Sequence, residues 1–226
     1  MNLEIDHVFC FVDPELKELE KLVKNGFKAN ISRIHKGQGT ANRCVFFKKN
    51  YLELIYLTSI EEAKANPLKL HIRALWQETG ACPFGIGLRG HVFKEERKLF
   101  YEYKPDYLPK GEILIYKESI KKPYYPLFFI VPSKEALADH WPANNNSIPQ
   151  EELENKFGIT SIETVEITGP EIAPVSLVEN IPGITLKKEE NYFMKIGVNG
   201  DLHDIIHINS LLSCIPVKSR YISGSR

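Results

Sequence analysis

The sequence lacks an excess of either charge and any long apolar run. Its 29 lysines and arginines balance 29 aspartates and glutamates. A balanced surface without single-sign blocks argues against binding to nucleic acid or to an anionic membrane. No apolar stretch approaches the roughly 18 residues that a membrane-spanning helix needs, and the start has no basic region followed by an apolar run. We therefore expect a soluble, cytoplasmic protein.

Cysteine is also scarce. The four cysteines are widely scattered, with no CxxC pair: Cys10, Cys44, Cys82 and Cys214. This pattern excludes a disulfide-rich scaffold, and we expect reduced thiols. A cysteine-dependent enzyme that uses Cys44 or Cys10 with His35 or His7 is a third possibility, although no motif in the sequence supports it strongly.

The most informative stretch is residues 35–57, HKGQGTANRCVFFKKNYLELIYL. A glycine-rich turn precedes two apolar runs of strand length, which predict an antiparallel hairpin around a turn at residues 48–50. Because side chains alternate along a strand, Glu53 shares a face with Tyr51 and Ile55, and the opposite face is apolar too. A covered carboxylate costs roughly several kcal/mol unless it is paired, protonated or bound to a metal. The sequence thus predicts a partner for Glu53.

A β-α-β-β-β unit is predicted over residues 3–57. Residues 3–12 alternate as a strand with His7 in its middle, and the apolar spacing after Pro14 predicts a short amphipathic helix that ends at Asn25 and Gly26. Residues 27–34 add a strand before the hairpin. Farther along, residues 58–80 and 92–103 are predicted helical. Residues 84–90, 113–116 and 126–131 are predicted strands, and the glycines of the first leave room for a neighbouring group.

The last third of the chain has the same predicted order of elements. Strands are predicted at residues 161–167, 184–187, 192–196 and 202–208, with a weak helix at 170–180. Overlaying the two units places Glu53 opposite Asp204 and His7 opposite Thr164. A repeated unit is a signal of the fold. We therefore predict an α+β protein of paired βαβββ modules, the first at residues 1–57 and the second at 158–210, with helices and strands at 58–157 that extend the sheet and a tail at 211–226.

These residues resemble the vicinal oxygen chelate superfamily, and more narrowly its bacterial glyoxalase-like domain proteins. The resemblance is carried by IDHVFCFV with His7, HKGQGTANR at 35–43, YLELI with Glu53 and FGIGLR at 84–89. In that superfamily, paired βαβββ units form a cup-shaped sheet that holds a divalent metal, and each unit typically offers one ligand from its first strand and one from its last. The resemblance implies His7 and Glu53 as metal ligands, with Asp204 as a third ligand or a general base.

The resemblance also implies a chemistry. Imidazole and carboxylate suit zinc, manganese, iron or nickel, and such a metal would act as a Lewis acid on an enediolate or oxyanion. We expect a small oxygen-rich organic ligand, lyase, isomerase or dioxygenase chemistry, and a possible homodimer. Glu53, Asp204 and His35 are the candidate catalytic residues. The candidate substrate-binding residues are Thr40, Asn42, Arg43 and Arg89.

Alternatives stay open at this point. Thr164 is a poor metal ligand, so a metal-free protein that binds or sequesters a small molecule, anchored by Arg43 and Arg89, competes with the enzyme. A shift of one residue in the last strand would present His203 and His207 instead of Asp204.

Glu53 has a simpler interpretation as well. It could form a buried ion pair with Arg33, Arg43 or Arg89, which would leave the cup without a metal.

Overall fold

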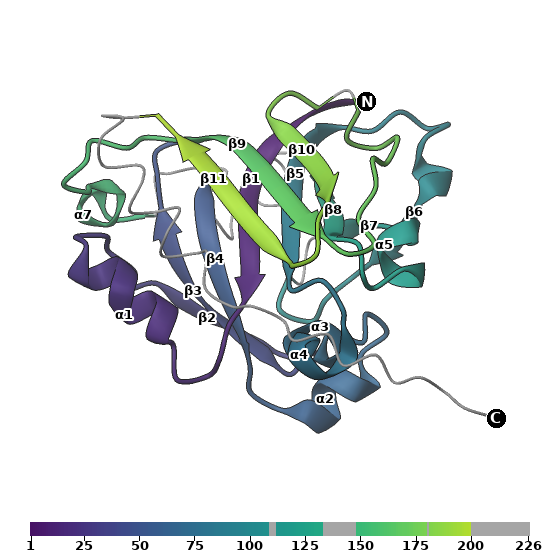
Figure 1. Cartoon of the computed structure of the whole chain (residues 1–226), viewed down its shortest axis with the longest axis horizontal. Coiled ribbons are helices and arrows are strands. Elements are labelled where there is room, and N and C mark those ends of the chain that lie inside the picture. Colours follow the sequence, from purple (N-terminus) through teal and green to yellow (C-terminus); the bar gives the residue numbers. More distant parts are fainter. Residues whose placement is uncertain (109–111, 133–147, 180, 200–226) are drawn as a thin grey trace.

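The computed structural model describes residues 1–108, 112–132, 148–179 and 181–199. Its strands form two sheets, and its helices are short. The larger sheet has eight strands in the order β2-β3-β4-β1-β5-β8-β7-β6, and the smaller has three in the order β10-β9-β11 (Figure 1). The predicted α+β class, with a large mixed sheet, is confirmed.

The first half of the large sheet has the predicted β-α-β-β-β order. It comprises β1 (Asn2–Phe11), α1 (Lys17–Lys24), β2 (Ser32–His35), β3 (Thr40–Phe46) and β4 (Tyr51–Leu57). β1 runs parallel to β4, and β3 forms antiparallel pairs with both β4 and β2. The alternating apolar residues and the glycine-rich loop therefore predicted this half correctly.

Three short helices follow where one helical segment was predicted. They are α2 (Ile60–Ala65), α3 (His71–Ala74) and α4 (Trp76–Thr79). The Ser59 side chain accepts a hydrogen bond from the backbone N–H of Glu62 at the start of α2. Pro67 and the positive φ of Lys69, 51°, separate α2 from α3.

The second half of the large sheet repeats the pairing of the first. It contains β5 (Phe84–His91), the 3-10 turn η1 (Arg97–Leu99), β6 (Phe100–Tyr103), β7 (Ile113–Tyr116), α5 (Lys117–Lys121) and β8 (Leu127–Pro132). β5 runs parallel to β8, the pairs β8–β7 and β7–β6 are antiparallel, and β5 joins β1 antiparallel. The predicted helix at 92–103 is wrong, because Phe100 and Tyr103 are buried from a strand.

The unit that pairs with the first half in the sheet is therefore residues 84–132, and the prediction of 158–210 for that place differs from the structure. After α7 (Gln150–Leu153), residues 162–198 form the small sheet from β9 (Ile162–Gly169), β10 (Ile184–Lys188) and β11 (Phe193–Val198). β9 lies between parallel β10 and antiparallel β11. The described residues 170–179 form no helix, and the predicted strand at 202–208 and the tail lie outside the described residues.

The two sheets enclose the main apolar core. Val8 and Leu54 of the large sheet and Ile167 and Met194 of the small sheet are fully buried in one cluster. Burial of each such side chain contributes about 1.5–3 kcal/mol. Because side chains alternate, the neighbours of Val8 and Leu54 point to the other face of the large sheet, where a separate apolar cluster lies.

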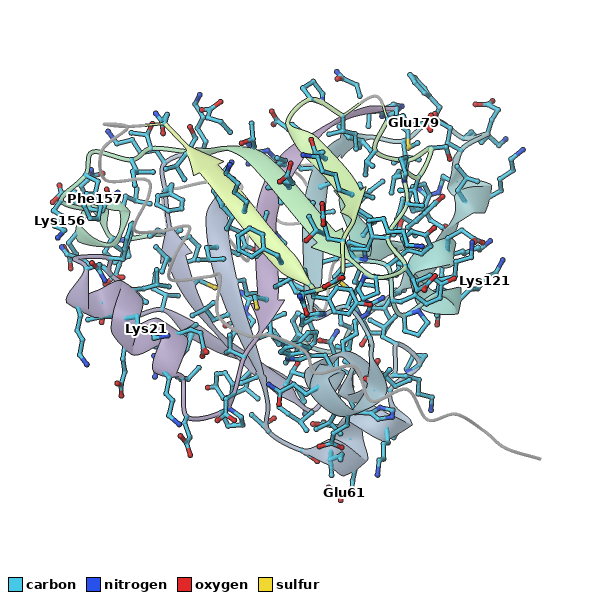
Figure 2. The ribbon with its side chains drawn as sticks, viewed as in Figure 1. Lys21, Glu61, Lys121, Lys156, Phe157 and Glu179 are labelled. Atoms are coloured by element: carbon cyan, nitrogen blue, oxygen red, sulfur yellow. The ribbon has the colours of Figure 1, made fainter. Side chains whose placement is uncertain are left out.

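Charged side chains lie around the outside of this two-sheet body. Figure 2 shows Lys21, Glu61 and Lys121 pointing away from the sheets. No described helix has both the length and the apolar character needed to span a membrane.

Candidate functional site

A cavity of about 100 Å³ lies on the face of the large sheet that carries His7 and Glu53. Most of its wall is apolar or aromatic, including Phe9, Ile115 and Phe129. Its charged and amide side chains come from β1 to β4 and the loop between β2 and β3: Asp6, His7, Arg33, His35, Gln38, Asn42 and Glu53. The cavity therefore offers a polar end and an apolar body to a small molecule.

A β-bulge in β1 brings Asp6 beside His7. The register of β1 with β5 shifts between Ile5 and His7. Side chains of consecutive strand residues ordinarily point to opposite faces, and a bulge changes that direction. Here Asp6 Oδ2 lies 2.8 Å from His7 Nδ1. This contact orients the imidazole so that Nε2 faces Glu53.

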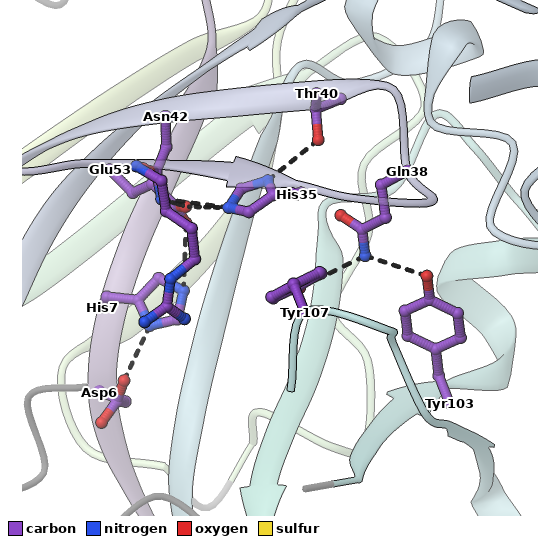
Figure 3. Close-up of polar contacts among 10 residues, drawn as sticks. Asp6, His7, His35, Gln38, Thr40, Asn42, Glu53, Tyr103 and Tyr107 are labelled. Atoms are coloured by element: carbon purple, nitrogen blue, oxygen red, sulfur yellow. Dashed lines mark hydrogen bonds and ion pairs between the residues drawn. The ribbon is translucent and has the colours of Figure 1, made fainter. Parts of the chain in front are cut away.

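Glu53 is the centre of the polar end. It is 7% exposed, and its Oε2 lies 3.5 Å from His7 Nε2 while Oε1 lies 3.6 Å from His35 Nε2 (Figure 3). Asn42 Nδ2 donates a short hydrogen bond to Oε1. The predicted partner of the covered carboxylate is thus a set of two imidazoles and one amide.

Asn42 has a fixed orientation in this set. Its Oδ1 accepts a hydrogen bond from the backbone N–H of Arg33 at 2.7 Å, so its Nδ2 must face Glu53 and, at 3.2 Å, His35 Nε2. An amide nitrogen only donates, so His35 Nε2 accepts. Of the predicted substrate-binding residues, Asn42 lines the cavity, but its amide N–H groups are directed at the two protein side chains.

His35 is held as a neutral imidazole. Its Nδ1 lies 3.0 Å from Thr40 Oγ1, which gives Thr40 a role in orienting the ring. Burial lowers the pKa of His35 below its ordinary value, with an opposing contribution from the nearby Glu53 carboxylate. The candidate catalytic residue His35 is therefore next to Glu53, and its burial favours the uncharged imidazole.

The two predicted arginine anchors do not line the cavity. Arg43 pairs with Leu54 across β3 and β4, so it points to the opposite face from Glu53 and donates to the carbonyl of Asn30 at 3.3 Å. Arg89 donates to Glu4 Oε1 at 2.7 Å and lies 3.5 Å from Asp6 Oδ1. Arg89 therefore acts on the site only through Asp6.

Several lining residues had no signal in the sequence. Asp6 depends on the bulge, and Tyr103, Tyr107 and Phe129 come from the half of the sheet that was not recognised as the second module. The described residues do not include Asp204, His203 or His207. Which of these side chains faces the cavity therefore stays a prediction.

In the second half of the cup, no His, Cys, Asp or Glu side chain of the described strands β5 and β8 lines the cavity. Gly85 and Gly87 occupy the cavity face of β5, where a Cβ atom would overlap the rings of Phe9 and His7. On β8, that face carries Leu127 and Phe129. The glycines predicted to leave room for a neighbour therefore make room for side chains of β1.

The described donors do not complete a metal site. His7 Nε2 and Glu53 Oε2 have about the separation of two ligands that each lie ~2.1 Å from one ion. His35 cannot readily join them, because the Asn42 amide donates to both His35 and Glu53. Within the described ranges, no three His, Cys, Asp or Glu side chains are grouped to hold a metal. A metal here stays a prediction, with Asp204 as its untested third ligand.

Residues 5–91 match the family model of the glyoxalase-like domain. Over this stretch the chain is similar to a glyoxalase-like domain. The match spans β1 to β5 and includes His7, the glycine-rich loop and Glu53, which confirms the resemblance predicted from those residues.

Solved structures with a similar arrangement include a hypothetical protein from Staphylococcus aureus, at 15% identity and a TM-score of 0.48, covering 85% of this chain and 88% of that one. Methylmalonyl-CoA epimerase from Mycobacterium tuberculosis matches at 14% identity and a TM-score of 0.40, covering 60% and 91% of the two chains. A methylmalonyl-CoA epimerase from Streptomyces coelicolor also scores 0.40 at 14% identity, covering 58% and 97%. The sequence matches no curated protein. At these scores the likeness assigns neither substrate nor reaction to this chain.

Proposed function

We propose that this glyoxalase-like protein binds a small organic molecule with an apolar body and an oxygen-bearing head, and that Glu53 takes a proton from it. One observation carries the proposal. A buried carboxylate, contacted by His7, His35 and Asn42, lies at the polar end of a cavity whose remaining wall is largely apolar.

The two carboxylate oxygens have different surroundings. Oε1 accepts the Asn42 hydrogen bond, whereas Oε2 faces only an imidazole nitrogen at 3.5 Å among the contacts of the described residues. If His7 keeps its proton on Nδ1 for Asp6, its Nε2 presents a lone pair to Oε2. Two acceptors then face each other, and a proton between them satisfies both. Oε2 is thus the atom suited to accept a proton from a ligand and share it with His7.

The reaction class follows from this arrangement. A proton on the carbon next to a carbonyl moves to Glu53 Oε2, and the electron pair of the broken C–H bond moves to the carbonyl oxygen as an enolate. Return of the proton to the same carbon, or to a neighbouring one, gives an isomerised product. Asp6 stabilises the imidazolium that forms when His7 takes up the shared proton. Among the chemistries expected from the resemblance, isomerase or lyase activity suits these residues best.

A sequestering protein is the second candidate. It is favoured by the apolar second half of the cavity, where glycines, Leu127 and Phe129 replace reactive groups. Such a protein would bind the same ligands and return them unchanged.

Proton exchange tests the proposal. Small ketones and α-hydroxycarbonyl compounds are screened for binding by ligand-observed NMR, and the binders are incubated with protein in D₂O. We expect loss of the α-proton signal with the parent protein and a rate about 10²–10⁴-fold lower with Glu53→Gln. Glu61→Gln, at an exposed position on α2, is the matched control and keeps the parent rate.

Two outcomes would contradict proton transfer. Exchange at the parent rate in Glu53→Gln removes Glu53 as the base, and tight binding without exchange favours sequestration. Elemental mass spectrometry on the parent, His7→Ala and Glu53→Gln proteins determines separately whether a metal is held. Near-stoichiometric metal that is lost in both variants would support the predicted His7 and Glu53 ligands.

A further inference from the structure

A second polar group lies in the cavity beyond the Glu53 cluster. Gln38, from the loop between β2 and β3, directs its Nε2 at the phenol oxygens of Tyr103 at 3.2 Å and Tyr107 at 3.4 Å (Figure 3). Both tyrosines come from the second half of the sheet and the segment that follows β6. This group joins the two halves of the cup.

Asn66 provides a second donor to the Tyr103 oxygen. Its Oδ1 accepts the backbone N–H of Leu68 at 2.9 Å, and its Nδ2 donates to the carbonyl of Gly37 at 2.6 Å and to the phenol oxygen of Tyr103 at 2.8 Å. The oxygen of Tyr103 thus accepts from both Asn66 and Gln38. Its own proton must be donated to a third group.

The described residues provide no acceptor for either phenol proton. Tyr103 and Gln38 are 7% and 5% exposed. Water therefore accepts the phenol proton of Tyr103 less readily than it would at the surface. Burial also raises the pKa of Tyr107 well above its ordinary value, so its hydroxyl keeps its proton. One buried O–H donor, on Tyr103, and one partly buried donor, on Tyr107, are therefore available to a molecule in the cavity.

The two donors are close to the proton-accepting end. The ring of Tyr107 lies 4.9 Å from that of His35, centroid to centroid, and His35 contacts Glu53. A molecule bound between them could place one atom near Glu53 and another near the phenols. Such a molecule would present a carbon acid to Glu53 and, to the phenols, the carbonyl oxygen that takes up its electron pair.

We propose that the hydroxyl groups of Tyr103 and Tyr107, aligned by Gln38 and Asn66, bind the carbonyl or enolate oxygen of the ligand. The ligand class is then a small ketone or related carbonyl compound with an apolar substituent that fills the Phe9 and Phe129 side of the cavity. This inference rests on the proposed function for its ligand, but the oxygen site is tested without turnover.

A matched pair of probes tests the oxygen site. 4-Nitrophenolate carries an anionic oxygen where 4-nitrotoluene carries a methyl group, and the visible band of the phenolate reports its ionisation and hydrogen bonding. We expect the parent protein to bind the phenolate more tightly. Tyr103→Phe and Tyr107→Phe should each weaken phenolate binding about tenfold or more, because hydrogen bonds to charged groups are lost, and change nitrotoluene binding about twofold or less.

Three further variants keep the result interpretable. Tyr101→Phe removes an exposed phenol from the same strand as Tyr103 and should leave both affinities unchanged. Gln38→Glu supplies a carboxylate that accepts both phenol protons, so it should abolish the preference for phenolate while both tyrosines remain. Glu53→Gln should retain phenolate binding, which separates this site from the proposed base. Circular dichroism verifies that each variant is folded.

The outcomes that overturn the two proposals differ. Nitrotoluene binding without a preference for phenolate, or a preference that survives both tyrosine variants, overturns the oxygen site alone. Failure of the parent protein to bind either probe overturns the oxygen site and the ligand-binding cavity together.

Discussion

The two halves of the eight-stranded sheet share a strand order but differ in the chemistry of their cavity face. The first half contributes His7, His35, Asn42 and Glu53, which contact one another. The second contributes glycines on β5 and apolar side chains on β7 and β8. The strands of the two halves pair alike, so the difference resides in the side chains and in the bulge of β1 that directs Asp6 toward His7.

This asymmetry bears on the metal and on the ligand. If each half offered one ligand from its first strand and one from its last, four donors would converge, but here only the first half has them. The second half instead gives apolar surface and the phenol of Tyr103. A ligand in the cavity would therefore have its reactive end against the first half and its body against the second.

The largest expected loss of stability comes from removing the buried guanidinium of Arg73, which binds carbonyl groups of the second half. Arg73, on α3, is 4% exposed and donates at 2.7–2.9 Å to the carbonyls of Cys82, just before β5, of Ser119, within α5, and of Tyr125, just before β8. Burial lowers the pKa of Arg73 to about 10, and the side chain remains charged at neutral pH. Arg73→Met should lower the free energy of unfolding by about 3 kcal/mol or more, because three buried carbonyls lose a donor.

Urea denaturation measures this loss. Arg97→Met is the control, because Arg97 is partly exposed and pairs with carboxylates at the surface, so its loss should be about 1 kcal/mol or less. A loss below about 1 kcal/mol in Arg73→Met would show that the carbonyls find other donors.

A smaller effect is expected where the two halves meet. A Cβ atom at Gly87 would overlap the imidazole of His7, and one at Gly85 would overlap the ring of Phe9. Each alanine substitution should cost about 1–3 kcal/mol of overpacking, measured by urea denaturation. Only Gly87→Ala should also shift the NMR resonances of the His7 imidazole, since it moves that ring relative to Asp6 and Glu53.

Equal perturbation of the His7 resonances by both substitutions would indicate a general distortion of β1. Gly158→Ala adds a Cβ in open space and serves as the control for overpacking, although its positive φ carries a strain cost of its own.

The first half of the sheet could be predicted because its signals are local. Alternating residues define β1 and β4, and the glycine-rich loop separates β2 from β3. The single acid on an apolar strand, Glu53, predicts a polar partner for its carboxylate. His7 is among the residues that contact Glu53, as the module spacing suggested. A short-range pattern suffices where strands and turns are adjacent in the chain.

The rest of the site depends on features that a pattern of residue types does not carry. A bulge, and not alternation, directs Asp6 toward His7. The charged spacing of residues 92–103 imitates a helix, which concealed β6 and Tyr103. Residues 162–198 form three strands without the predicted helix between the first two, and a predicted order of elements does not determine which sheet a strand joins. Residues 84–132 took that place by pairing β5 with β1.

The smallest expected effect concerns pH, and it should come from the polar half. Burial holds the pKa of His35 below its ordinary value of about 6.5. The His35 imidazole therefore binds a proton less strongly in the folded protein than in the unfolded chain. As the pH falls below about 6.5, the unfolded state binds more protons, and the free energy of unfolding decreases until the folded-state pKa is reached. The decrease is at most about 1.4 kcal/mol per pH unit.

Urea denaturation between pH 7 and pH 5 measures this slope. His35→Asn should flatten it, because the titrating group is gone. His91→Asn replaces an exposed histidine at the end of β5 and should leave the slope as it is in the parent protein. If His35→Asn kept the slope of the parent protein, groups other than His35 would carry the pH dependence. A flattened slope in His35→Asn alone would locate the titration in the same set of side chains that distinguishes the first half of the sheet from the second.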